Sequence, residues 1–144
     1  MAMVNKSVGT SMFQNLFILD KYNESKDIMK NGELSCARYV SSLLLLTSPD
    51  LITRVRATVS GLEKDLRLKE WYVTGQPLIG SIAFWEPLRG NRHVGFYIGG
   101  GRAISNSTSE GIPKNHSLHF EDEEGFHRKV GKFYFHSILK NDSL

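Results

Sequence analysis

Residues 93–106 read HVGFYIGGGRAISN and carry the clearest indication of secondary structure in the sequence. Its first six residues alternate between one set that is mainly apolar and one that carries His93, so the two sets face opposite sides of a β-strand. Gly99-Gly100-Gly101 then supply the positive φ angles that a tight turn needs. A return strand is predicted over 102–107. The sequence therefore predicts an antiparallel hairpin with a histidine at its start.

Around this hairpin, the second half of the chain favours strands, whereas the first half favours helices. Further strands are predicted over 82–85 and 133–135, which are rich in β-forming residues. Apolar spacing predicts helices over 12–19, 23–30 and 35–47. A fourth helix is expected from Ser60, which has capping-box spacing to Glu63. Helices followed by an antiparallel sheet indicate an α+β fold.

Length and composition indicate a globular chain. With 144 residues, the chain is predicted to be a single domain (1–144), in which residues 1–30 form a helical N-terminal extension. Acidic and basic residues are interleaved and the net charge is only +3, which argues against a nucleic-acid partner. No apolar run reaches the 18 or so residues of a membrane span. No signal peptide is visible, so we expect a cytoplasmic protein or one exported by a route not encoded here.

The single cysteine, Cys36, excludes an internal disulfide and a cysteine-rich metal site. It is predicted to lie at the start of the strongest helix, where free N–H groups and the helix dipole stabilise a thiolate. We therefore expect its pKa to be lowered. His93 follows on a strand and can take the thiol proton. His116, His119 and His127 lack the partners of a metal site, and no metal or cofactor is expected.

Three segments resemble the NlpC-type cysteine peptidases, compact bacterial members of the papain-like group. Residues 35–40, SCARYV, resemble the nucleophile helix of that family; residues 80–85, GSIAFW, resemble its first core strand; residues 93–104 resemble its histidine strand and hairpin. The resemblance covers roughly residues 33–107. It implies a papain-like fold, with N-terminal helices packed on a small antiparallel sheet, and a Cys36–His93 pair.

The sequence departs from the family pattern at several positions. Ser35 and Ser81 stand where aspartates are usual, and Ser105 stands where the third catalytic residue, often histidine, would fall. Asn106 has better chemistry for orienting His93 but the wrong strand parity, so it would need a β-bulge to turn inward. We expect Asn106 to be the third catalytic residue, with Ser105 and His116 as the alternatives.

These residues predict a cysteine-dependent amide hydrolase. The resemblance implies short peptides, above all peptidoglycan stem peptides, as the substrate. Two alternatives remain open: an inactive or catalytically weak binding module of the same fold, and a transferase or deamidase that uses the same cysteine. The oligomeric state is left open.

Overall fold

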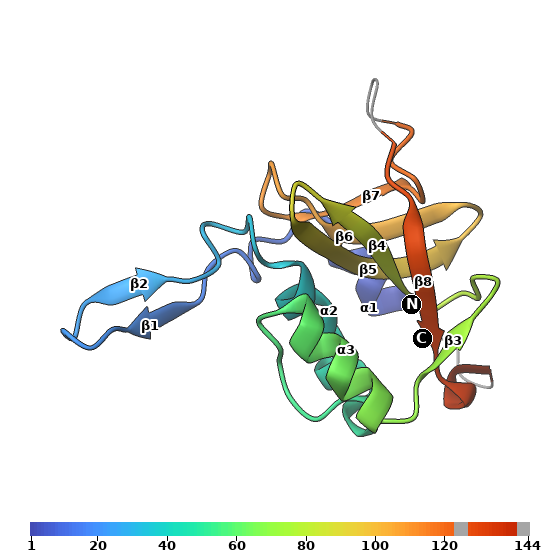
Figure 1. Cartoon of the computed structure of the whole chain (residues 1–144), viewed down its shortest axis with the longest axis horizontal. Coiled ribbons are helices and arrows are strands. Elements are labelled where there is room, and N and C mark those ends of the chain that lie inside the picture. The colour runs from blue at the N-terminus through green and yellow to red at the C-terminus, as the bar shows by residue number, and fades with distance from the viewer. Residues whose placement is uncertain (123–126, 141–144) are drawn as a thin grey trace.

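The computed structural model describes residues 1–122 and 127–140 and contains a six-stranded sheet (Figure 1). The strand order is β3-β8-β4-β5-β6-β7, and all neighbouring strands are antiparallel. The strands are β3 (Tyr72–Thr74), β4 (Ile82–Leu88), β5 (Asn91–Gly99), β6 (Arg102–Asn106), β7 (Pro113–Ser117) and β8 (Val130–Phe135). The predicted α+β class is confirmed, and so are the hairpin and the last strand. β3 and β7, the two edge strands, were not predicted.

Three α-helices precede this sheet: α1 (Ala2–Lys6), α2 (Cys36–Thr47) and α3 (Val59–Leu68). The described part of the chain also contains two short 3₁₀ helices, η1 (Pro49–Leu51) and η2 (Ser137–Lys140). Within residues 1–122 and 127–140, no helix combines the length and the apolar character that a bilayer crossing requires.

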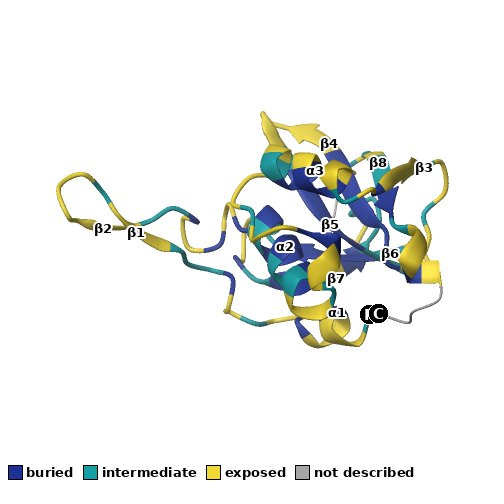
Figure 2. Cartoon of the chain, turned by 90° about the horizontal axis from the view of Figure 1, so that it is seen from below, coloured by how far each residue is buried: buried dark blue, intermediate teal, exposed yellow. Residues whose placement is uncertain are grey.

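The main core lies between α2 and one face of the sheet. The predicted apolar stripe of α2 is buried there, with Val40 and Leu44 at its centre. From the sheet, Val94, Phe96 and Ile104 meet it. Figure 2 shows this interior as dark blue ribbon under the helices. Burial of these side chains, each worth about 1.5–3 kcal/mol, holds α2 in a fixed position on β5 and β6.

A smaller cluster lies on the opposite face of the sheet. Ala83, Trp85 and Ala103 are buried there, packed against partly buried residues that include Phe120 and Phe133. The Trp85 indole Nε1 donates a hydrogen bond to the Leu118 carbonyl oxygen at 2.8 Å. That bond ties the chain after β7 over this face, which is the face that carries His93.

Helix α3 is fixed to the sheet by one carboxylate. Glu63 accepts hydrogen bonds from Lys132 and Tyr134 of β8 and from Arg92 of β5, at 2.5–2.9 Å. The helix begins as predicted to within a residue, but its cap is Thr58, whose hydroxyl accepts from the Gly61 N–H at 3.1 Å. The prediction of Ser60 as the cap is therefore wrong.

The N-terminal 30 residues differ most from expectation. Instead of helices over 12–19 and 23–30, the chain forms a two-stranded hairpin, β1 (Phe17–Leu19) with β2 (Ser25–Asp27), which projects from the body (Figure 1). The Asp20 carboxylate accepts from the N–H groups of Tyr22 and Glu24 and so closes the turn. Only α1 is helical here, so the predicted helical extension is wrong.

Candidate functional site

Cys36 is the first residue of α2, as predicted, and is half-buried. Burial raises the pKa of its thiol above the ordinary value of 9.0. Hydrogen bonds from the backbone N–H groups of Val94 and Ala37, and the positive charge of Arg128, lower the pKa but do not outweigh burial. The expectation of a lowered thiol pKa is therefore wrong: Cys36 does lie at the helix start, but burial of the thiol outweighs the groups that lower its pKa.

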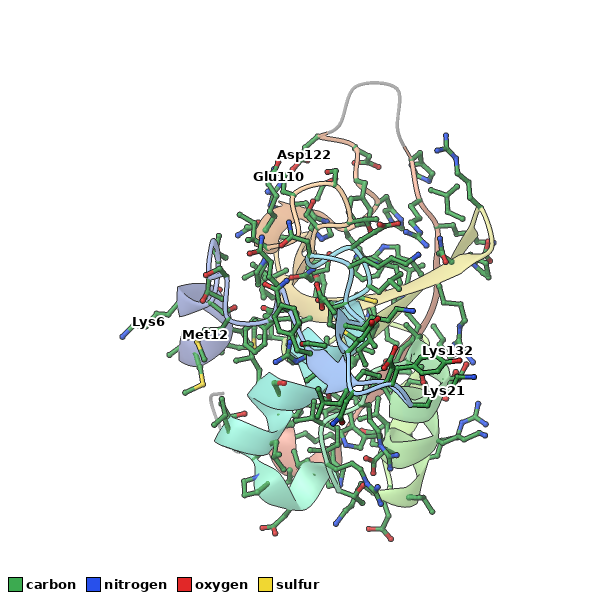
Figure 3. All side chains as sticks on the ribbon, turned by 90° about the vertical axis from the view of Figure 1, so that its left-hand side faces the viewer. Lys6, Met12, Lys21, Glu110, Asp122 and Lys132 are labelled. Carbon is green, nitrogen blue, oxygen red and sulfur yellow. The ribbon has the colours of Figure 1, made fainter. Side chains whose placement is uncertain are left out.

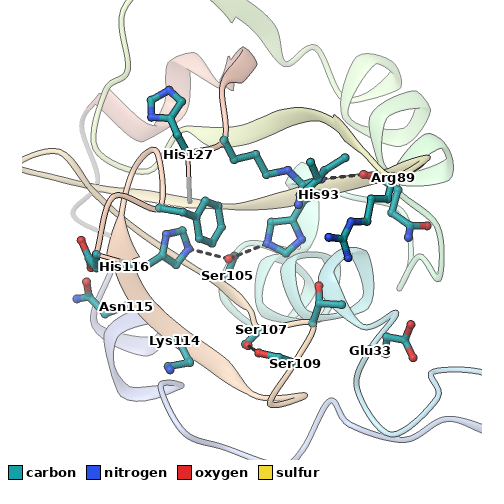
Figure 4. Close-up of a pocket in the computed structure, with 16 residues that line it drawn as sticks. Glu33, Arg89, His93, Ser105, Ser107, Ser109, Lys114, Asn115, His116 and His127 are labelled. Atoms are coloured by element: carbon teal, nitrogen blue, oxygen red, sulfur yellow. Dashed lines mark hydrogen bonds between the residues drawn. The ribbon is translucent and has the colours of Figure 1, made fainter. Parts of the chain in front are cut away.

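His93 belongs to a chain of hydrogen bonds that crosses three strands. Its Nε2 lies 2.8 Å from the Ser105 hydroxyl, and that hydroxyl lies 2.7 Å from Nε2 of His116 (Figure 4). The chain ends at the Ser117 carbonyl oxygen, 2.7 Å from Nδ1 of His116. We call His93, Ser105 and His116 the relay. Each of the three is at least 93% buried.

Strand register brings the relay together. Ser105 pairs with Gly95 across β5 and β6, and His116 pairs with Ala103 across β6 and β7, so all three relay side chains project from one face. A Cβ at Gly95 would lie 2.6 Å from the Ser105 Cβ. The glycine therefore lets β5 and β6 approach closely enough for the relay bonds to form.

The hydrogen-bond pattern assigns the proton positions. A carbonyl oxygen only accepts, so Nδ1 of His116 carries a hydrogen and its Nε2, in the neutral ring, does not. The Ser105 hydroxyl then donates to His116 and accepts from Nε2 of His93. Neutral His93 is left with a bare Nδ1, the position that a general base uses.

Both histidines are neutral near pH 7. Burial, with the charges of Arg128 and His116 acting in the same direction, lowers the pKa of His93 to about 3. Burial also lowers the pKa of His116, against an opposing hydrogen bond to Ser117. Aromatic rings provide the apolar surroundings: Phe120 stacks on His116 at 4.0 Å between centroids, and Trp85 lies 5.3 Å from His93.

Asn106 does not join the relay. Strand β6 pairs with β7 in unbroken register, with no bulge at Asn106, so its side chain projects from the α2 face. Its Nδ2 donates to the Gly32 carbonyl oxygen at 2.8 Å, while its buried Oδ1 has no partner. The expected contact from Asn106 to His93 is wrong because the strand keeps its alternation. Ser105, the alternative with the correct parity, occupies that place.

Cys36 and His93 meet β5 from its two sides. Cys36 packs with the core on the α2 side, and the Val94 N–H, the peptide group next to His93, hydrogen-bonds its sulfur. The His93 ring lies on the other face, where it lines a pocket of about 930 Å³ with Ser105 and His116. Cys36 is not among the residues that line this pocket.

Two groups at this site were missed by sequence reasoning. Arg128 is close enough to influence both Cys36 and His93, and Phe120 stacks on the relay. Neither belongs to a periodic pattern, so the sequence offers no signal for them. The sequence also predicts an acidic, exposed loop over 121–125. Of this loop only Glu121 and Asp122 lie within the described residues, and both are exposed.

The described histidines form no metal centre. His119 and His127 stack on each other with centroids 5.3 Å apart, but within residues 1–122 and 127–140 no group of three or more potential ligands is arranged to hold a metal ion. Comparison with known proteins adds no identity to this geometry. No family model matches the chain, and no curated protein matches it.

Proposed function

We propose that this protein is a cysteine-dependent amide hydrolase with a papain-like arrangement, acting on short peptides such as peptidoglycan stem peptides. One observation carries the proposal. The relay leaves Nδ1 of His93 bare, and the N–H of the next residue, Val94, lowers the pKa of the only thiol in the chain. A thiol at a helix start paired with an oriented imidazole is the arrangement that nucleophilic catalysis uses. Here the two side chains meet β5 from opposite sides, and among the described residues no hydrogen bond joins them.

In this mechanism both groups start neutral. Cys36 Sγ bonds to the amide carbonyl carbon while its proton passes to Nδ1 of His93, a transfer that needs the His93 ring to turn from the pocket face toward Sγ, since the two side chains meet β5 from opposite sides. The C–N bond breaks as that proton moves to the leaving amine, and a thioester remains. Water, deprotonated by the same nitrogen, then releases the acid and the free thiol. The backbone N–H groups of Val94, Ala37 and Cys36 stabilise negative charge that develops at or beside the Cys36 sulfur.

A second candidate is a binding module of the same fold. The raised thiol pKa, the lowered imidazole pKa and the position of Cys36 outside the pocket lining favour it. In that case the relay would orient a bound ligand and Cys36 would be a core residue.

Incubation with a peptidoglycan stem peptide, followed by mass spectrometry, tests the proposal. We expect release of a new amine by the natural chain and none by Cys36→Ala or His93→Ala. His136→Ala, a histidine near the C-terminus and outside the relay, serves as the matched control and should retain activity. Release that persists in Cys36→Ala would overturn the proposal, and absence of release by every variant would favour the binding module.

A further inference from the structure

The pocket over the relay has an unequal charge distribution. Figure 4 shows Arg89 beside His93 at one side of the pocket and His116, Asn115 and Lys114 at the other. At this second side the charges are compensated: Lys114 pairs with Glu110 at 2.6 Å and Asp122 pairs with Arg102 at 2.8 Å. Figure 3 shows Glu110 and Asp122 near the same end of the molecule.

Arg128 supplies a positive charge beside His93. Its Nε donates to the Glu86 carbonyl oxygen at 3.2 Å and one Nη donates to the Asn91 carbonyl oxygen at 2.7 Å. These acceptors fix the guanidinium over the turn between β4 and β5, but they are neutral. Within residues 1–122 and 127–140, no carboxylate forms an ion pair with Arg128.

The remaining geometry suits an anion. Arg128 is half-buried, and burial lowers its pKa, so its charge is only partly stabilised by water. A desolvated cation without a counter-ion is costly, and an incoming anion would remove that cost. The second Nη of Arg128 has hydrogens free to bind it, since Nε and one Nη hold the two carbonyl groups.

Arg89 adds a second cation at the rim. It lies in the turn between β4 and β5 with φ of 51°, a left-handed conformation that few residues other than glycine adopt. This backbone places an exposed arginine at the pocket beside His93 (Figure 4). Glu33 and Asp122 also line the pocket and would repel a doubly charged anion more than a singly charged one.

We propose that the pocket binds peptides through a carboxylate, which Arg128 and Arg89 hold beside His93. The ligand class is a short peptide with a free carboxylate near the bond presented to the site. As an assignment of substrate class, this inference rests on the proposed function. As an assignment of a binding site, it stands on the two arginines and the pocket alone.

Peptide binding is measured on Cys36→Ala, which cannot hydrolyse the ligand by the proposed route. This measurement tests the binding site separately from the hydrolase activity. The probes are N-acetyl-alanyl-alanine and its C-terminal amide, which differ only in the carboxylate, and calorimetry measures both dissociation constants. We expect the acid to bind at least about tenfold more tightly, as charge-assisted hydrogen bonds allow. Adding Arg128→Gln should reduce that ratio to below about twofold, whereas Arg128→Lys should keep part of it.

Arg54→Gln is the matched control, because it removes an exposed arginine outside the pocket lining and should leave the ratio unchanged. Inorganic phosphate should compete less well than acetate at the same pH. If Arg128→Gln does not fold, Arg89→Gln should lower the ratio, and added salt should lower it in the parent protein. Equal binding of acid and amide, binding of neither, or a ratio unchanged by loss of the arginines would overturn the inference. Hydrolysis plays no part in this result.

Discussion

The two faces of the sheet carry opposite chemistry on the same strands. On the α2 face, β5 and β6 contribute Val94, Phe96 and Ile104 to a closed apolar core. On the other face, the same strands contribute His93 and Ser105, whose Nε2 and Oγ atoms are paired within the relay. Successive side chains of a strand point to opposite faces of the sheet. A single peptide group of β5 therefore separates the apolar core from the relay. Cys36 meets the strand at that peptide from the apolar side.

The difference shows how a buried polar group is tolerated. An unpaired hydroxyl or imidazole in an apolar environment costs about 1–3 kcal/mol, so the relay residues are stable only as a connected set. The α2 face has no such set, and the buried Asn106 Oδ1 and Ser35 Oγ there are without partners. We expect function to depend on the relay residues and on Cys36, and much less on Asn106.

The largest loss of turnover is expected when Cys36 or His93 is replaced. Cys36→Ala and His93→Ala should each lower the turnover rate by roughly 10³-fold or more, because they remove the nucleophile or its base. Circular dichroism and thermal unfolding should show Cys36→Ala still folded, since the lost volume is small. Turnover within tenfold of the natural chain in either variant would place the chemistry elsewhere.

A smaller effect should distinguish neighbouring residues on the two faces. Ser105→Ala should lower kcat by roughly ten- to a hundredfold, because His93 loses the partner that fixes its tautomer. Asn106→Ala should change kcat by less than about threefold. The pH profile of kcat should also shift in Ser105→Ala but not in Asn106→Ala, a readout that simple loss of packing would not produce. The reverse order would restore Asn106 as the orienting residue.

The relay should also make stability depend on pH. Burial lowers the pKa of His93 to about 3 from its ordinary 6.5. Between these values the unfolded chain binds a proton that the folded chain does not, so the free energy of unfolding falls as pH falls from 6.5 toward 3. One proton corresponds to about 1.4 kcal/mol per pH unit. Urea unfolding at pH 6.5, 5.5 and 4.5 should show this slope reduced by about one proton in His93→Gln; identical slopes would contradict a buried neutral His93.

The pH at which the Cys36 thiol becomes reactive should be modestly higher than for an ordinary cysteine. Because burial raises the pKa of Cys36 above 9.0, alkylation by iodoacetamide should be slow at pH 7 and its rate should rise with an inflection above pH 9. An inflection well below the ordinary value would mean that the helix start and Arg128 outweigh burial. The rate as a function of pH, followed by mass spectrometry, measures this directly.

Sequence patterns predicted the parts of the fold in which burial and periodicity agree. Helix α2 and the β5–β6 hairpin follow from apolar spacing, and the parity of Ser105 follows from the same alternation. The β1–β2 hairpin was not predicted, because Phe17 has helical spacing to Phe13 and Leu19 has it to Leu16, yet Phe17 and Leu19 are 63% and 66% exposed. The turn signal at Asp20 and Asn23 was present and outweighed that spacing.

The contact between His116 and Ser105 could not be predicted from local sequence patterns. Strand β7 reads PKNHS, with no apolar alternation, so nothing in the sequence places His116 beside Ser105. Its partner is set by pairing with β6, which is a tertiary contact. The sign of the thiol pKa shift was missed for the same reason: helix position can be predicted from sequence, whereas the depth at which the helix start is buried depends on what packs over it.

The central claim is that Cys36 and His93 act as a pair across β5. The most direct test is the rate at which a short peptide vinyl sulfone labels Cys36 at pH 7, measured by intact-mass spectrometry in the natural chain, His93→Ala and Asn106→Ala. Because addition needs the thiol proton to leave, we expect His93→Ala to slow labelling by roughly a hundredfold and Asn106→Ala to leave the rate nearly unchanged. Equal labelling rates in all three proteins would contradict the pairing.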